Sequence, residues 1–219
     1  MRALLLGNSQ IICNESIPAL LRRLAASLAP PAELEVEAVA IGGATIETLW
    51  NDGRPLAAVR RGGWDRVLFH EIVASYGGTG ERLREFGLRF AHEAAAVGAR
   101  VVVYASGDVE HQRATHTGMY ADALSLARAC GGRVAGGGMA WLRAWRERPD
   151  LDFHHVDRAH ASLRGYYLNA GVILAALTDR SPIGGEAGGL PADDAAFLQR
   201  IAAGQSADDR RAEAALAAS

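Results

Sequence analysis

The chain has 219 residues and a formal net charge of −2, from 23 basic and 25 acidic residues. This length suits one well-buried α/β domain and leaves little room for a second. The near-zero charge excludes the strongly basic surface that nucleic acids and anionic membranes require. We therefore expect a small-molecule or carbohydrate ligand, with no nucleic-acid and no membrane partner, and leave the oligomeric state open.

Cysteine usage and the amino end bear on the compartment. The two cysteines, Cys13 and Cys130, are far apart in the sequence and give no disulfide framework, which is typical of a reducing environment. The first apolar run begins near residue 2 without a charged leader or a cleavage site, and no segment is long enough to span a membrane. We therefore expect a cytoplasmic protein.

The first apolar run, Ala3–Leu6, is too short for a helix and is followed by Gly7, Asn8 and Ser9. Short apolar runs that end in glycine are typical of buried strands in parallel sheets. In open α/β sheets, ligands and catalytic groups gather just past the carboxyl ends of such strands. Ser9 is therefore a candidate nucleophile.

A helix is predicted over residues 15–28, and apolar residues that alternate with glutamates predict an edge strand over 34–40. That strand ends at Gly42 and Gly43. A glycine in this place lets backbone approach a ligand, and the N–H of Gly43 is a candidate donor to an oxyanion. A tight strand-to-helix turn is the alternative reading of the same spacing.

The third apolar strand, residues 65–69, leads into His70 and Glu71 at the same expected edge. The glycine-rich segment 74–80 is expected to line a site, and the polar segment 106–117 to be a specificity loop. Later apolar patterns predict further elements. These are helices over 81–97, 119–130 and 163–177 and strands over 101–104 and 133–135.

Trp141 and Trp145 are four residues apart and share one face of a predicted helix. Such pairs usually fill a core, and a sugar-stacking platform is the alternative. Beyond Pro182, the glycine-rich segment and the Ala/Asp/Arg-rich tail predict an extension over 183–219, a short helix followed by a loosely ordered terminus.

Asp157 precedes His160 by three residues, on a loop that leads into the predicted helix 163–177. An aspartate at this spacing can orient the imidazole through one ring nitrogen and leave the other free to take a proton from a serine. Ser9, His160 and Asp157 thus supply a nucleophile, a general base and a residue that orients the base.

Three segments together resemble the SGNH/GDSL hydrolase superfamily. Gly7-Asn8-Ser9 resembles its first block, with Asn in place of the usual Asp; Gly42-Gly43-Ala44-Thr45 resembles its second, and Asp157 to His160 its last. The resemblance spans roughly residues 2 to 180. With the alternation of strands and helices, it implies a hydrolase domain over 1–182. The implied fold is a three-layer α/β/α sandwich around a flavodoxin-like, doubly wound parallel sheet of about five strands.

The third block departs from the family pattern. It usually ends in an Asn that helps to hold the oxyanion, whereas this chain has Leu68-Phe69-His70-Glu71. His70 can donate a hydrogen bond in the same place, or it can be a packing histidine or one held by Glu71. The resemblance thus implies an oxyanion hole made by Ser9, Gly43 and His70.

The resemblance implies a serine esterase that hydrolyses short-chain or carbohydrate O-acyl esters without a cofactor, with the acetyl ester of a sugar preferred. Asn8, Glu71 and Trp141 are candidate substrate contacts. One alternative is a metal-dependent hydrolase. Its ligands would be His154, His155, Asp157 and His160. Adjacent histidines on an extended segment point to opposite sides, however, which disfavours this reading. The other alternative, suggested by the missing third-block Asn, is a non-catalytic carbohydrate-binding protein.

Overall fold

Five parallel strands form one sheet in the computed structural model, which describes residues 1–13, 16–71, 80–107 and 114–218. In chain order they are β1 (Arg2–Gly7), β2 (Glu35–Ala40), β3 (Arg66–Phe69), β4 (Arg100–Tyr104) and β5 (Arg133–Ala135). Across the sheet their order is β2-β1-β3-β4-β5. The chain adds β2 on one side of β1 and then β3 on the other, so the carboxyl ends of β1 and β3 border the switch point where open α/β sheets bind ligands.

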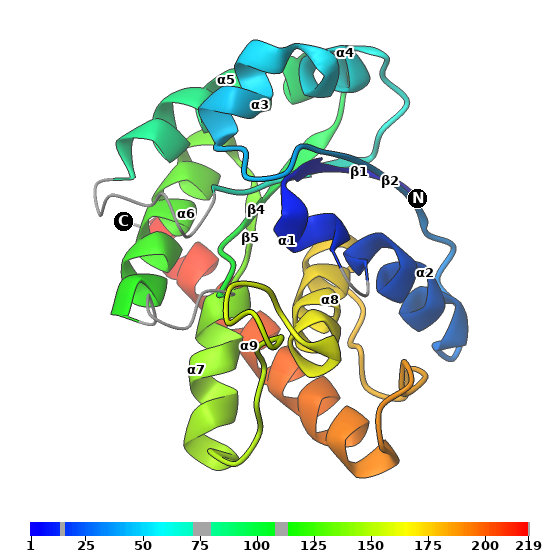
Figure 1. The fold of residues 1–219 in the computed structure, drawn as a ribbon. Coiled ribbons are helices and arrows are strands. Elements are labelled where there is room, and N and C mark those ends of the chain that lie inside the picture. Colours follow the sequence, from blue (N-terminus) through cyan, green and yellow to red (C-terminus); the bar gives the residue numbers. More distant parts are fainter. Residues whose placement is uncertain (14–15, 72–79, 108–113, 219) are drawn as a thin grey trace.

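Helices cover both faces of this sheet (Figure 1). One face carries α3 (Ile46–Asp52), α4 (Arg54–Arg60), α5 (Glu81–Ala96) and α6 (His116–Cys130). The other carries α2 (Ile17–Ser27), α7 (Gly137–Glu147), α8 (Leu163–Thr178) and α9 (Ala192–Ala218). The architecture confirms the predicted three-layer α/β/α fold with a doubly wound parallel sheet. None of the helices within the described ranges is long and apolar enough to cross a membrane.

The apolar run of β1 is continuous because the strand is buried on both faces. Ala3 and Leu5 pack into the core under α2 and α8, whereas Leu4 and Leu6 pack into the core under α3 and α5. Each of these side chains is fully buried. Two-sided burial removes the need for polar alternation, so the strand is apolar at four successive positions.

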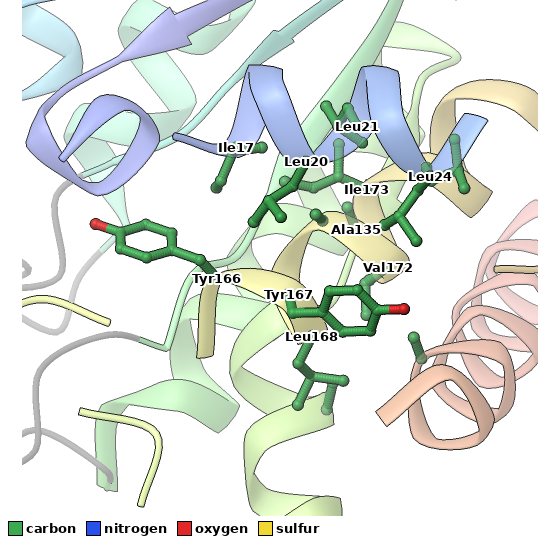
Figure 2. Close-up of a cluster of buried hydrophobic side chains, with 14 of the residues drawn as sticks. Ile17, Leu20, Leu21, Leu24, Ala135, Tyr166, Tyr167, Leu168, Val172 and Ile173 are labelled. Carbon is green, nitrogen blue, oxygen red and sulfur yellow. The ribbon is translucent and has the colours of Figure 1, made fainter. Parts of the chain in front are cut away.

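Helix α8 is the centre of one core layer, and its apolar side chains meet those of α2 (Figure 2). Leu20 and Leu24 lie one turn apart on α2 and point toward α8. Ser162 caps α8, since its hydroxyl accepts the backbone N–H of Gly165 at 3.5 Å. A buried α8 fixes the chain that enters it, which is the segment that carries Asp157 and His160.

Two short helices, α3 and α4, follow the turn of Gly42 and Gly43, as the alternative reading of a strand-to-helix turn implied, but the sequence predicted no bounds for them. Each has seven residues, which is too few for a helical period to stand out, and Gly53 separates them with a φ of +82°. The side chain of Thr45 begins α3 by accepting the backbone N–H of Thr48 at 3.1 Å. The loop that carries Gly43 therefore ends at the first turn of a helix.

The two loops that were expected to line the site fall largely outside the described residues. This applies to residues 74–79 of the glycine-rich segment and to residues 108–113 of the polar segment. The end of the polar segment differs from the prediction, because His116 is buried at the start of α6 instead of lying in a solvated loop.

Helix α9 corrects the prediction of a short helix with a loosely ordered terminus. It has 27 residues, and its buried side chains join the core around α8. Asp209 and Glu213, one turn apart, accept the backbone N–H groups of Gly136 at 3.0 Å and Val134 at 2.7 Å. These two donors are two residues apart on the edge strand β5 and its continuation, so α9 satisfies the outer edge of the sheet.

We predict that Glu213→Ala lowers the free energy of unfolding by about 1–3 kcal/mol, because the buried N–H of Val134 loses its acceptor. Denaturant unfolding measures the change. Glu147→Ala is the control, since it removes an exposed ion pair with Arg200 and should cost less than about 1 kcal/mol. Equal losses in the two variants would show that the edge contact adds nothing.

Candidate active site

Ser9 lies at the carboxyl end of β1, in the first turn of the short helix α1 (Ser9–Ile12). The side chain of Asn8 caps this turn by accepting the backbone N–H of Gln10 at 3.0 Å. The carbonyl of Ser9 accepts the N–H of Cys13 at 2.8 Å and the hydroxyl of Tyr166 at 3.5 Å. The backbone of Ser9 is thus held from two directions, and its side chain is partly exposed.

Asp157 and His160 lie on a tight loop between α7 and α8. Two backbone hydrogen bonds close the loop, from Ser162 N–H to the carbonyl of Phe153 and from His155 N–H to that of His160, each at 2.8 Å. The paired backbone makes the loop a short antiparallel ladder that projects from the start of α8. Its rigidity presents the two side chains to the edge of the sheet.

The structure brings Ser9, His160 and Asp157 into one line of contacts. His160 Nε2 lies 3.0 Å from Ser9 Oγ, across 151 positions of the sequence, and His160 Nδ1 lies 2.7 Å from Asp157 Oδ2. Asp157 Oδ1 also accepts the backbone N–H groups of Ala159 and His160, each at 3.0 Å.

These contacts fix the charge of Asp157. The backbone N–H of His160 has the largest effect on the pKa of the Asp157 carboxyl. Burial raises this pKa, but the ring of His160 and the N–H of Ala159 add to the lowering and hold it well below the ordinary value. An ionised carboxylate only accepts hydrogen bonds, so the Nδ1 of His160 carries the ring proton. Nε2 of the neutral ring is then an acceptor for the hydroxyl of Ser9.

Gly43 lies on an exposed turn with a φ of +67°. Apart from its two chain neighbours, no atom of the described residues lies within 4 Å of the position that a Cβ would take. Side chains from two neighbouring loops hold this turn in place. Asn8 Nδ2 donates to the carbonyl of Ala44 at 3.0 Å, and Glu71 Oε1 accepts the N–H of Ile46 at 3.4 Å. The structure therefore joins the turn of Gly43 to the loops after β1 and β3.

Asn8 and Glu71 were expected to contact substrate, and the structure corrects this. Their exposed fractions are 0% and 2%, so their side chains face the protein and not the solvent. Glu71 Oε2 accepts Arg82 Nε at 2.6 Å, which provides the buried carboxylate with a cation. Sequence reasoning missed Arg82, because one arginine in the first turn of α5 carries no spacing signal that links it to Glu71.

His70 was expected to donate to the oxyanion, and its surroundings contradict this. The side chain is buried, and Nδ1 lies 3.1 Å from the backbone carbonyl of Glu71, an obligate acceptor. Burial lowers the pKa of His70 to about 4, so near neutral pH the ring holds one proton, on Nδ1. Nε2 has only a lone pair there and faces Gly7, and among the described residues it has no hydrogen-bond partner.

Trp141 was a candidate for sugar stacking, and the structure places it in the core. Its side chain is fully buried, and its indole N–H donates to Asn169 Oδ1 at 2.9 Å. The rings of Trp145, Phe153 and His154 surround it with centroids 5.2–5.5 Å away. This agrees with the core interpretation of the tryptophan pair and removes Trp141 from the substrate contacts.

Of the four residues of the alternative metal site, His155 and His160 both approach Asp157, with their Nδ1 atoms 3.5 Å and 2.7 Å from its Oδ2. His154 is buried and stacks on Trp145, with an interplanar angle of 18°. Within the part of the chain that the structure describes, no group of three or more His, Cys, Asp or Glu side chains is arranged to hold a metal ion. The local geometry instead uses Asp157 and His160 as partners of each other.

We predict that His70 makes the protein sensitive to acid. The pKa of His70 is about 4 in the folded protein, whereas the pKa of histidine in an unfolded chain is about 6.5. Between these two pH values, His70 therefore binds a proton only in the unfolded chain. The free energy of unfolding therefore falls as pH drops through this window, by up to about 3 kcal/mol in total. His70→Gln, which keeps a donor for the Glu71 carbonyl, should remove most of this loss.

The measurement is the difference in unfolding free energy between wild type and variant at pH 7 and pH 4.5. Asp209 acts in the opposite sense, because burial raises its pKa to about 6, so only the difference isolates His70. His92→Gln is the matched control, since His92 is exposed on α5. The same acid loss in His70→Gln as in wild type would refute the prediction.

Comparison with known proteins gives the fold an external check. No protein-family model matches the sequence, and no curated protein matches it. A proposed SGNH hydrolase from Slackia heliotrinireducens is 23% identical over 81% of this chain and 98% of its own, with a TM-score of 0.64. A DUF4886 family protein from Bacteroides uniformis is 17% identical over 93% of both chains, with a TM-score of 0.71. Axe2, an acetylxylan esterase from Geobacillus stearothermophilus, is 14% identical over 81% of this chain and 94% of its own, with a TM-score of 0.64. The chain therefore has the fold of the SGNH hydrolases.

Proposed function

We propose that the protein is a serine esterase of the SGNH/GDSL hydrolase superfamily, with Ser9 as nucleophile, His160 as general base and Asp157 as its orienting carboxylate. The observation that carries the proposal is the unbroken line of contacts from Asp157 Oδ2 through the imidazole of His160 to Ser9 Oγ. A nucleophile, a base and an orienting group within hydrogen-bond reach are the signature of nucleophilic catalysis.

In the first half of the reaction, Ser9 Oγ attacks the ester carbonyl while Nε2 of His160 takes the hydroxyl proton. Asp157 stabilises the imidazolium that forms and keeps the ring in its orientation. The tetrahedral oxyanion is held by the backbone N–H groups of Ser9 and of Gly43, whose turn is exposed and open. Nε2 then returns the proton to the leaving alkoxide.

In the second half, His160 removes a proton from water, whose oxygen attacks the carbonyl carbon of the acyl group on Ser9. The bond between that carbon and Ser9 Oγ then breaks, Nε2 of His160 returns the proton to Oγ, and the carboxylic acid leaves. The cycle needs no cofactor, because all proton transfers pass through one imidazole. The ionised state of Asp157, held by two backbone N–H groups, supports the imidazolium in both halves.

We further propose an acetyl ester of a sugar as the preferred substrate. The support is twofold: a net charge of −2 does not favour a polyanionic substrate, and one protein of similar fold is named as an acetylxylan esterase. Both cysteines are free thiols, which suits the cytoplasm as the proposed compartment.

Labelling of the nucleophile tests the proposal directly. A fluorophosphonate probe should modify the wild-type protein at Ser9, and Ser9→Ala should neither be labelled nor hydrolyse 4-nitrophenyl acetate, because the nucleophile is gone while little of the core changes. Thermal unfolding checks that the variant folds. An adduct on another serine, or wild-type turnover by Ser9→Ala, would reject the proposed mechanism.

The role of Asp157 is tested separately. Asp157→Asn should fold and lower kcat by at least about 10²-fold, because an amide neither fixes the ring tautomer nor stabilises the imidazolium. Asp52→Asn is the control, since Asp52 is also an exposed partner of a nearby side chain, Arg54, but lies on α3. If both variants keep the wild-type rate, Asp157 has no part in the chemistry.

A further inference from the structure

Arg158, between Asp157 and Ala159, has a left-handed backbone with a φ of +56°. Side chains with a Cβ avoid this region, and arginine has no short polar group to favour it. The only other non-glycine residue with a positive φ in the described ranges is Asp179, which ends helix α8, where that conformation is common. Arg158 has no such helix end to account for it.

The left-handed residue shapes the contacts of Asp157. The N–H of Arg158 donates to the carbonyl of His155 at 2.9 Å, which closes the turn. The next two N–H groups, of Ala159 and His160, then both point at Asp157 Oδ1. Oδ2 faces the ring of His160 at 2.7 Å, and His155 Nδ1 lies 3.5 Å from the same oxygen. The conformation at Arg158 therefore sets the direction of the carboxylate.

An ion pair holds this conformation in place. The guanidinium of Arg158 donates to Asp152 Oδ2, across the base of the loop. Asp152 is itself anchored, because its Oδ1 accepts the N–H of His154 at 3.0 Å and its carbonyl accepts the hydroxyl of Ser162 at 3.2 Å. Asp152 thus connects the turn to both sides of the loop and to the cap of α8.

We propose that Asp152 and Arg158 are positioning residues, whose ion pair keeps the turn in the left-handed form that aims Asp157 at His160. This inference rests on the proposed function. Exposed ion pairs usually contribute little to global stability, so the effect falls on geometry at the triad and not on the fold. Small errors in the placement of catalytic groups cost rate because the reacting atoms must be aligned.

A comparison of Arg158→Gly with Arg158→Ala separates the effect of the turn conformation from the effect of the guanidinium. Arg158→Ala removes the ion pair and keeps a Cβ, so the turn relaxes; Arg158→Gly removes the ion pair but adopts a positive φ freely. Asp152→Asn removes the charge and keeps the Oδ1 acceptor for the N–H of His154.

The readouts are kcat and KM for 4-nitrophenyl acetate and the rate of fluorophosphonate labelling at Ser9. We expect Asp152→Asn and Arg158→Ala to lower kcat and the labelling rate by about 10-fold, equivalent to about 1.4 kcal/mol of barrier, with KM unchanged. Arg158→Gly should keep at least about half of the wild-type kcat, and adding Asp152→Asn to it should cause no further loss.

Arg148→Ala is the matched control, because it removes the neighbouring exposed ion pair with Asp150, at 2.7 Å, which does not touch the turn. It should leave kcat unchanged. Equal losses in Arg158→Gly and Arg158→Ala would overturn the proposal by showing that the guanidinium acts itself, and so would an unchanged kcat in Asp152→Asn. Failure of the proposed function is distinct: wild type would then be neither active nor labelled at Ser9.

Discussion

The contact between His160 Nε2 and Ser9 Oγ is the interaction on which the rest of the site depends. It joins the end of the first strand to a loop 151 positions later, so each side must be rigid for the two atoms to meet. On one side, buried β1 and the cap by Asn8 hold Ser9. On the other, the paired backbone of the loop and the buried helix α8 hold His160. Ser9 lies at the point where the strand order reverses, since β2 lies on one side of β1 and β3 on the other, and open α/β sheets gather their loops there.

Several turns and one sheet edge are held by side chains that bind backbone groups. Three of these side chains are carboxylates and one is an amide. Asp157 binds two N–H groups within its own loop, Glu71 binds the first turn of α3, and Glu213 binds the edge of β5. Asn8 does the same with a carbonyl in the Gly43 turn. In each case an orphan backbone group gains a partner, and the side chain becomes unable to move. Around Ser9, the turns are therefore held by such polar contacts in addition to the apolar layers that cover the sheet.

Local patterns in the sequence carry the strands, most helices and the pair of Asp157 and His160, because each depends on neighbours within a few residues. The apolar run of β1 and the three-residue spacing of the loop are visible without tertiary knowledge. Helix α9 was not predicted at its full length because its buried face mixes polar residues, among them Gln199, Gln205 and Asp209, with apolar ones. Its carboxylates have partners on β5 and just after it, 79 and 73 residues earlier in the chain. No local pattern indicates the partners of Glu71 either, because Ile46 and Arg82 contact it only in the folded chain.

His70 shows most clearly why a match of single sequence blocks to a family does not determine the chemical role of a residue. Its ring fills the space beside Gly7, where a Cβ would lie 2.7 Å from Nε2 and 2.5 Å from Cγ1 of Ile11. Gly7 and His70 are thus complementary in volume, and a side chain at position 7 would need His70 and Ile11 to yield room. A histidine chosen for shape in a buried site stays neutral, and its one proton goes to the nearest fixed acceptor, the Glu71 carbonyl. His70 therefore stands at the end of β3, where the resemblance implies an oxyanion donor. The direction of its N–H is set instead by packing against Gly7 and by the Glu71 carbonyl, which a match of single sequence blocks does not reveal.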